Sequence, residues 1–228
     1  MSNVLHSAPF AIAITIAVYW VALRVHRRYL WANPLVLGTV LLVLCLYGFH
    51  IPFSSYRRGG DIFTSLLGPA TVALAVPMYK QMRPMRKALG RLIAVVTVGS
   101  IVGMTTAALT VWMLGAPHSL VAAAVPKSVT TPIAVQVAQE LGGDPAITVA
   151  MVLLTGVLGS AIGPAVLRLA GIRHEHAIGA AIGTSSHAIG TASLIRQSEV
   201  QGSVSSLAMV LAGVLTSVLA IGLTWVWR

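Results

Sequence analysis

Long apolar stretches recur along this chain of 228 residues, and they constrain its fold more than any other feature. A helix needs about 20 apolar residues to cross the hydrocarbon of a bilayer, and eight stretches approach or exceed that length. The sequence therefore predicts an all-α integral membrane protein with about seven or eight membrane segments. The predicted segments are 8–24, 34–51, 61–80, 88–115, 118–140, 145–167, 176–197 and 203–227.

Charge supports the membrane assignment. Only 9% of the residues are charged, whereas a soluble domain carries about 25%. The net charge of +10 comes from basic residues that cluster between apolar segments, which indicates contact with an anionic lipid leaflet rather than with nucleic acid. No Lys or Arg precedes the first apolar segment, so we expect no cleaved signal peptide. The single cysteine, Cys45, excludes an intrachain disulfide.

Three of the segments, 61–80, 118–140 and 176–197, contain proline or glycine where an ordinary membrane helix would be continuous. Such residues free backbone groups that lipid cannot satisfy, so the breaks must be buried in protein or line a cavity. The predicted helix breaks are Pro69, Pro126, Pro132, Gly183 and Gly190.

Basic residues between the segments indicate how the chain is oriented. If those basic turns are cytoplasmic, the N-terminus is external, and 118–140 has to be a re-entrant hairpin folded at Pro126–Lys127. Segments 34–115 and 145–227 then run in opposite directions, which is the inverted-repeat arrangement of secondary transporters within one membrane domain, 1–228. Arg57 and Arg58 do not fit this orientation, and a crossing 118–140 segment stays open as the alternative. The basic residues that this orientation places in the cytoplasm are Arg24, Arg27, Arg28, Lys80, Arg83, Arg86, Lys87, Arg91, Arg168, Arg173 and Arg228.

The stretch PKSVTTPIAV (126–135) predicts an anion site. Thr131 followed by Pro132 is typical of an N-cap and a first helical position, and the N-terminus of a half-helix binds anions. Lys127 would add a positive charge, and Ser128, Thr130 and Thr131 would add hydroxyl groups. The alternatives are an ordinary packed kink and a lysine that reaches the membrane surface.

The stretch GTSSHAIGTA (183–192) has similar ingredients. Thr184, Ser185 and Ser186 could cap a second half-helix, and His187 would contact substrate or a proton; the alternative is a small-residue packing face. In segment 61–80, Thr71 could face the same cavity. Asp61 is predicted either to cap that segment or to couple transport to an ion or proton.

Enzyme chemistry is not indicated. No G-x-S-x-G motif is present, and no acid follows Ser186 and His187 to orient the imidazole. His174 and His176 are two residues apart, so they do not have the spacing of an HExxH metal site. We therefore expect no catalytic residues, no metal and no cofactor.

Three motifs resemble the LrgB/CidB family: GGDIFTSLLGPATVALAVPMYKQ (59–81), PKSVTTPIAVQVAQELGG (126–143) and GTSSHAIGTA (183–192). The resemblance extends from about residue 33 to residue 223. It implies a fold similar to the cation/proton antiporter and bile-acid symporter group, with crossed broken helices and inverted repeats.

The resemblance also implies function. The family was first described as antiholin-like modulators of murein hydrolase export and autolysis, and its plastid relatives are glycolate/glycerate translocators. We therefore expect a multi-pass protein of the bacterial inner membrane that carries small monocarboxylates such as glycolate, glycerate, lactate or pyruvate. The alternative is a holin-like oligomeric regulator. Expected partners are lipid, a second copy of the chain in a dimer, and a small membrane protein of the LrgA type.

Overall fold

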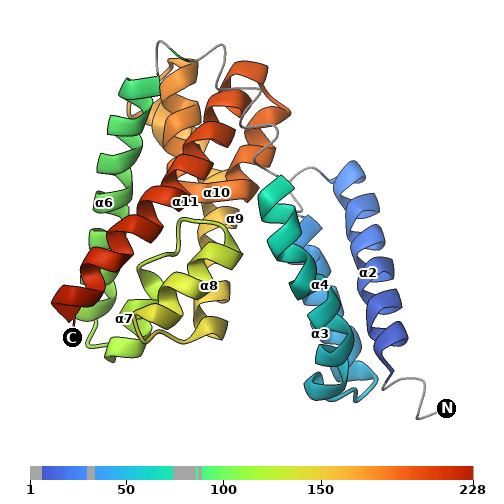
Figure 1. Cartoon of the computed structure of the whole chain (residues 1–228). Coiled ribbons are helices and arrows are strands. Elements are labelled where there is room, and N and C mark those ends of the chain that lie inside the picture. Colours follow the sequence, from blue (N-terminus) through green and yellow to red (C-terminus); the bar gives the residue numbers. More distant parts are fainter. Residues whose placement is uncertain (1–6, 30–33, 74–85, 87–88, 228) are drawn as a thin grey trace. The chain divides into compact units, whose positions relative to one another are not determined.

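The computed structural model describes residues 7–29, 34–73, 86 and 89–227, and its secondary structure there is helical (Figure 1). Four of the described helices are long and apolar enough to cross a membrane: Ala8–Arg28, Leu89–Met113, Pro145–Leu169 and Glu199–Leu223. The chain forms two compact units, Met1–Ala73 and Leu74–Arg228. The predicted repeat 34–115 includes residues of the first unit and the undescribed stretch 74–85. The inverted repeat and the single domain 1–228 therefore stay predictions.

The first unit contains helices α2 (Ala8–Arg28), α3 (Pro34–Gly48) and α4 (Phe53–Ala73), and α2 packs against both others. Gly59 of α4 lies so close to α2 that an added Cβ would be 2.6 Å from the Ala8 carbonyl oxygen and 2.6 Å from the Ala11 Cβ. The Thr15 and Tyr56 hydroxyls, 3.0 Å apart, join the same two helices.

Helix α4 corrects two predictions. It runs through Pro69 to Ala73, so this proline does not end the helix. Asp61 is not an N-cap either, because α4 begins at Phe53 and Asp61 lies inside it, 3.8 Å from Arg57 one turn earlier. The early part of the helix packs against α2 at Gly59, a contact that the local sequence does not reveal. Both charged side chains are exposed, so the pair adds little stability.

The second unit is built around three long helices, α6 (Leu89–Met113), α9 (Pro145–Leu169) and α11 (Glu199–Trp227). Helices α6 and α11 run in the same direction. Their first halves share a core cluster containing Val96 and Leu207, and their second halves share one containing Met104 and Ala220.

The segment predicted at 118–140 is a helical hairpin made of α7 (His118–Ala124) and α8 (Thr131–Glu140). The end of the hairpin returns to its start. A Cβ on Gly142 would be 4.0 Å from the His118 ring, and one on Gly143 would be 2.7 Å from the Ala123 nitrogen. Gly142 makes the return possible because its φ of 80° lies in the left-handed region. Residues 125–130 form the tip of this first hairpin.

Helix α10 (Glu175–Ile195) is a second hairpin rather than a broken helix that crosses. Its only non-helical residue is His187, with φ 39° and ψ −138°. Beyond this residue the chain turns back, as the close approach of Gly190 to Ile182 and Ser186 shows. The predicted breaks at Gly183 and Gly190 are therefore replaced by one reversal at His187, and both glycines serve close packing instead.

The two hairpins enter the second unit from opposite ends of α9. Val152, in the first half of α9, packs against the first hairpin, and Leu167, near its end, packs against α10. Figure 1 shows the same arrangement along α11, with α10 beside its first half and α7 and α8 beside its second half. The tips therefore meet near the middle of the long helices.

Candidate functional site

The tip of the first hairpin carries Lys127. Two turn hydrogen bonds, from Lys127 N to Ala124 O at 3.1 Å and from Val129 N to Pro126 O at 3.2 Å, hold the backbone between α7 and α8. The half-buried lysine side chain donates from Nζ to the Ser128 hydroxyl at 3.2 Å. No acidic side chain in the described ranges lies within ion-pair distance of this ammonium. Its positive charge is therefore not neutralised by that part of the chain.

Helix α8 begins one residue earlier than predicted. Thr130 is the N-cap, Thr131 is the first helical residue and Pro132 is the second. A proline is tolerated at either position because the first-turn N–H groups have no partner within the helix. The Thr130 side chain makes no capping bond, and its Oγ1 is buried without a hydrogen-bond partner. The N-terminus of α8 thus lies at the tip with its first amides uncapped.

The tip of the second hairpin rests on α9. His187 Nε2 donates to the Val152 carbonyl oxygen at 2.9 Å, and the Ser185 and Ser186 hydroxyls are 3.0 Å apart. A Cβ on Gly159 would overlap the Ser186 side chain. Only a glycine therefore allows the tip to approach α9 this closely.

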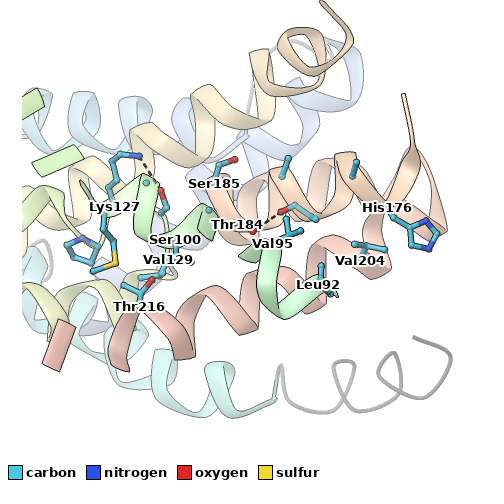
Figure 2. Close-up of a pocket in the computed structure, with 18 of the residues that line it drawn as sticks. Leu92, Val95, Ser100, Lys127, Val129, His176, Thr184, Ser185, Val204 and Thr216 are labelled. Carbon is cyan, nitrogen blue, oxygen red and sulfur yellow. Dashed lines mark hydrogen bonds between the residues drawn. The ribbon is translucent and has the colours of Figure 1, made fainter. Parts of the chain in front are cut away.

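Both tips border one cavity of about 810 Å³ (Figure 2). Helix α6 forms one wall, and Lys127 and His176 lie toward opposite ends of the view. His174 and His176 have ring centroids 5.2 Å apart. The described residues contain no group of three side chains that could hold a metal ion. The polar and basic residues that line the cavity are Arg91, Ser100, Lys127, Ser128, His174, His176, Thr184, Ser185 and Thr216.

The structure brings together four of the predicted site residues, because Lys127, Ser128, Thr184 and Ser185 all line this cavity. Ser186 and His187 do not line the cavity, because both are buried where the second tip contacts α9. Thr130 and Thr131 are not among the lining residues and lie next to them in the sequence, at the start of α8. Asp61 belongs to the first unit. The Thr71 side chain is outside the described residues.

Helix α6 supplies a group that the sequence did not reveal. Ser100 lines the cavity, is 6% exposed, and has a hydroxyl without a hydrogen-bond partner. One signal was available: Gly-Ser-x-x-Gly occurs in α6 at 99–103 and again in α9 at 159–163. The matching Ser160 differs, because its hydroxyl donates to the Val157 carbonyl at 2.9 Å.

Comparison with known proteins identifies a family for nearly the whole chain. The family model described as the LrgB-like family matches residues 15–226, which is nearly the whole chain. The chain belongs to the LrgB-like family. No solved structure matches it.

Curated relatives of this LrgB-like protein cover most of its length. An uncharacterized protein of Bacillus subtilis, YwbG, is 40% identical over 205 residues, covering 89% of this chain and 91% of the relative. An uncharacterized protein of Haemophilus influenzae is 37% identical over 209 residues, covering 91% and 90%. A holin-like protein CidB of Staphylococcus aureus is 30% identical over 210 residues, covering 91% and 92%. The resemblance seen in the three motifs is therefore confirmed at the level of the family.

Proposed function

We propose that this LrgB-like protein is a secondary-type carrier for small monocarboxylates of the glycolate, glycerate, lactate and pyruvate class. The observation that carries the proposal is the Lys127 ammonium, which lies on a cavity between two hairpin tips and has no acidic partner among the described side chains. A half-buried cation without an anion is costly within a membrane. A substrate carboxylate that enters the cavity would supply the missing charge.

The site fits a small anion in two further ways. The uncapped start of α8 directs the positive end of a helix dipole toward the tip, where it favours an anion. Ser128 and Ser185 line the same cavity and offer hydroxyl donors. The remaining lining is largely apolar, with residues such as Val95 and Ala181, and suits a short alkyl chain rather than a polar sugar.

The two hairpins support an arrangement in which both are re-entrant from opposite sides of the bacterial inner membrane. In this arrangement the end of α9 with Arg168 and the turn with Arg173 face the cytoplasm, and the end of the cavity lined by Arg91 lies toward the same side. A dimer and an LrgA-type partner remain part of the proposal, as do Asp61 and His187 as candidates for ion or proton coupling.

A holin-like role is the second candidate, and the names of the staphylococcal relatives favour it more directly than they favour a carrier. Staphylococcal relatives at 29% and 30% identity are called holin-like protein CidB. Such a protein would act as an oligomer that alters membrane permeability and so modulates murein hydrolase export and autolysis. It would not need a lysine held between two hairpin tips.

Uptake into liposomes separates the two candidates. Vesicles that contain only this chain are loaded with a trapped dye and supplied with labelled lactate or glycolate. A carrier gives saturable uptake that unlabelled pyruvate inhibits, while the dye stays inside. Non-saturable uptake together with dye release would support the holin-like role and overturn the carrier. Absence of uptake in vesicles whose protein is shown to be folded would also count against the carrier.

A further inference from the structure

Ser100 is an unusual residue for the interior of a membrane helix. A serine in a helix normally satisfies its hydroxyl on a carbonyl three or four residues earlier, as Ser160 does on Val157. The Ser100 hydroxyl has no such bond although the residue is 6% exposed. Burying an unpaired hydroxyl opposes folding, so a stability role does not account for this serine.

The position of Ser100 relative to Lys127 suggests what the hydroxyl binds. Both residues line the cavity, and Figure 2 shows them at the same end of it, away from His176. In a 2-hydroxy or 2-oxo acid the second oxygen is attached to the carbon next to the carboxylate. A group that recognises this oxygen must therefore lie close to the group that binds the carboxylate.

We propose that Ser100 is a specificity-determining residue that hydrogen-bonds the 2-oxygen of a 2-hydroxy or 2-oxo monocarboxylate held at Lys127. The inference rests on the proposed carrier function. A serine hydroxyl donates to a 2-oxo group, and it donates to or accepts from a 2-hydroxyl. Forming this bond costs little free energy, because the Ser100 side chain breaks no existing hydrogen bond when it rotates toward the substrate.

Selectivity follows from the same unpaired hydroxyl. A substrate with a 2-oxygen satisfies Ser100, whereas a plain carboxylic acid such as propionate leaves it unpaired. Sites built to bond a substrate hydroxyl reject the analogue that lacks it far more strongly than apolar pockets reject an extra methylene. Ser100 would thus exclude acetate and propionate, which carry the same charge.

Binding of lactate and propionate to purified protein tests the assignment, because the two acids differ only in the 2-hydroxyl group. For wild type we expect lactate to bind at least about tenfold more tightly than propionate. In Ser100→Ala, lactate should weaken by about threefold to tenfold and propionate should change by less than about twofold. Thermal stability should be equal or higher in the variant, because an unpaired polar group has been removed.

Ser160→Ala is the matched control, since it deletes the serine of the same Gly-Ser-x-x-Gly pattern where the hydroxyl is already bonded. It should leave the ratio of lactate to propionate affinity unchanged. An unchanged ratio in Ser100→Ala, or equal losses in both variants, would overturn the role of Ser100 while leaving the carrier proposal intact. A folded wild type that binds neither acid would overturn both.

Discussion

Ser198 donates a 2.6 Å hydrogen bond to the carboxylate of Glu175, although Glu175 is the first residue of α10 and Ser198 lies beyond its last residue, Ile195. A straight helix rises 1.5 Å per residue and would separate the two by about 30 Å. The contact therefore requires the chain to reverse within α10. The bond lies at the base of the second hairpin, with His187 at its tip.

Cross-linking tests this reversal. In a Cys45→Ala background, Glu175→Cys together with Ser198→Cys should form an intramolecular cross-link with a short bifunctional reagent. The matched control pair, Glu175→Cys with Ala188→Cys, should not react, because residue 188 lies at the tip. Measurement is by mass spectrometry after digestion. Failure of the 175/198 pair to react would mean that α10 is extended.

Cysteine accessibility tests the orientation of both hairpins. We expect Ala116→Cys and Glu140→Cys to be labelled from one side of the membrane, because His118 and Gly142 are neighbours at the base of the first hairpin. Ala170→Cys should be labelled only from the other side. These positions avoid glycines whose replacement would strain the backbone. Labelling of 116 and 140 from opposite sides would mean that the segment crosses.

The C-terminus should lie on the same side of the membrane as the base of the first hairpin. The second half of α11 packs with Val137 and Leu141 of the α8 region, so a C-terminal epitope tag should be accessible from the same side as position 116. This differs from the sequence prediction, which placed Arg228 with the cytoplasmic basic turns. A tag exposed with position 170 would contradict the hairpin in α10.

Replacing Lys127 tests the anion site. Lys127→Met keeps most of the side-chain volume and removes the charge, so the protein should be at least as stable, since an intramembrane charge is costly. Lactate affinity should fall by roughly tenfold to a hundredfold, the equivalent of a charge-assisted bond of about 1.5–3 kcal/mol. Lys127→Arg restores the charge but should recover affinity only in part, because the planar guanidinium differs from a compact ammonium. Wild-type affinity in Lys127→Met would show that the site is elsewhere.

His187 is expected to support the second tip. His187→Ala removes the bond to the Val152 carbonyl and leaves a non-glycine residue at a φ of 39°. We expect a loss of about 1–3 kcal/mol in stability, seen as a lower thermal midpoint in detergent. His187→Asn should lose less, because asparagine tolerates positive φ better than alanine does. Equal midpoints for wild type and His187→Ala would show that the ring is not a structural contact.

Gly183 tests the packing of α10 on α11. An added Cβ would overlap the backbone of Ser205, which cannot rotate away, so Gly183→Ala should destabilise the protein by about 1–3 kcal/mol. Gly222→Ala in α11 is the matched control, because nothing lies within 4 Å of its added Cβ. It should be neutral or slightly stabilising, since alanine favours helix by up to about 1 kcal/mol. A tolerated Gly183→Ala would mean that the helices are farther apart.

Membrane character, the bounds of the long helices α6 and α9 to within two residues, and the positions of the polar interruptions followed from the sequence alone. Each depends on local properties: apolar length, the preferences of proline, and hydroxyl groups near a charge. The predicted segment 145–167 therefore differs from α9 by two residues at one end. Lys127, Ser128 and Ser185 could be predicted as site residues for the same reason.

Tertiary structure decided what the interruptions do. Whether a chain continues or reverses after a break depends on one backbone conformation at His187 and on glycines that permit close contact with α9 and α11. The residues of α9 and α11 that make these contacts are distant in sequence from α10, so local sequence patterns do not predict them. Ser100 joined the site for the same reason: its helix lies beside the hairpin tips only after the three long helices have packed together.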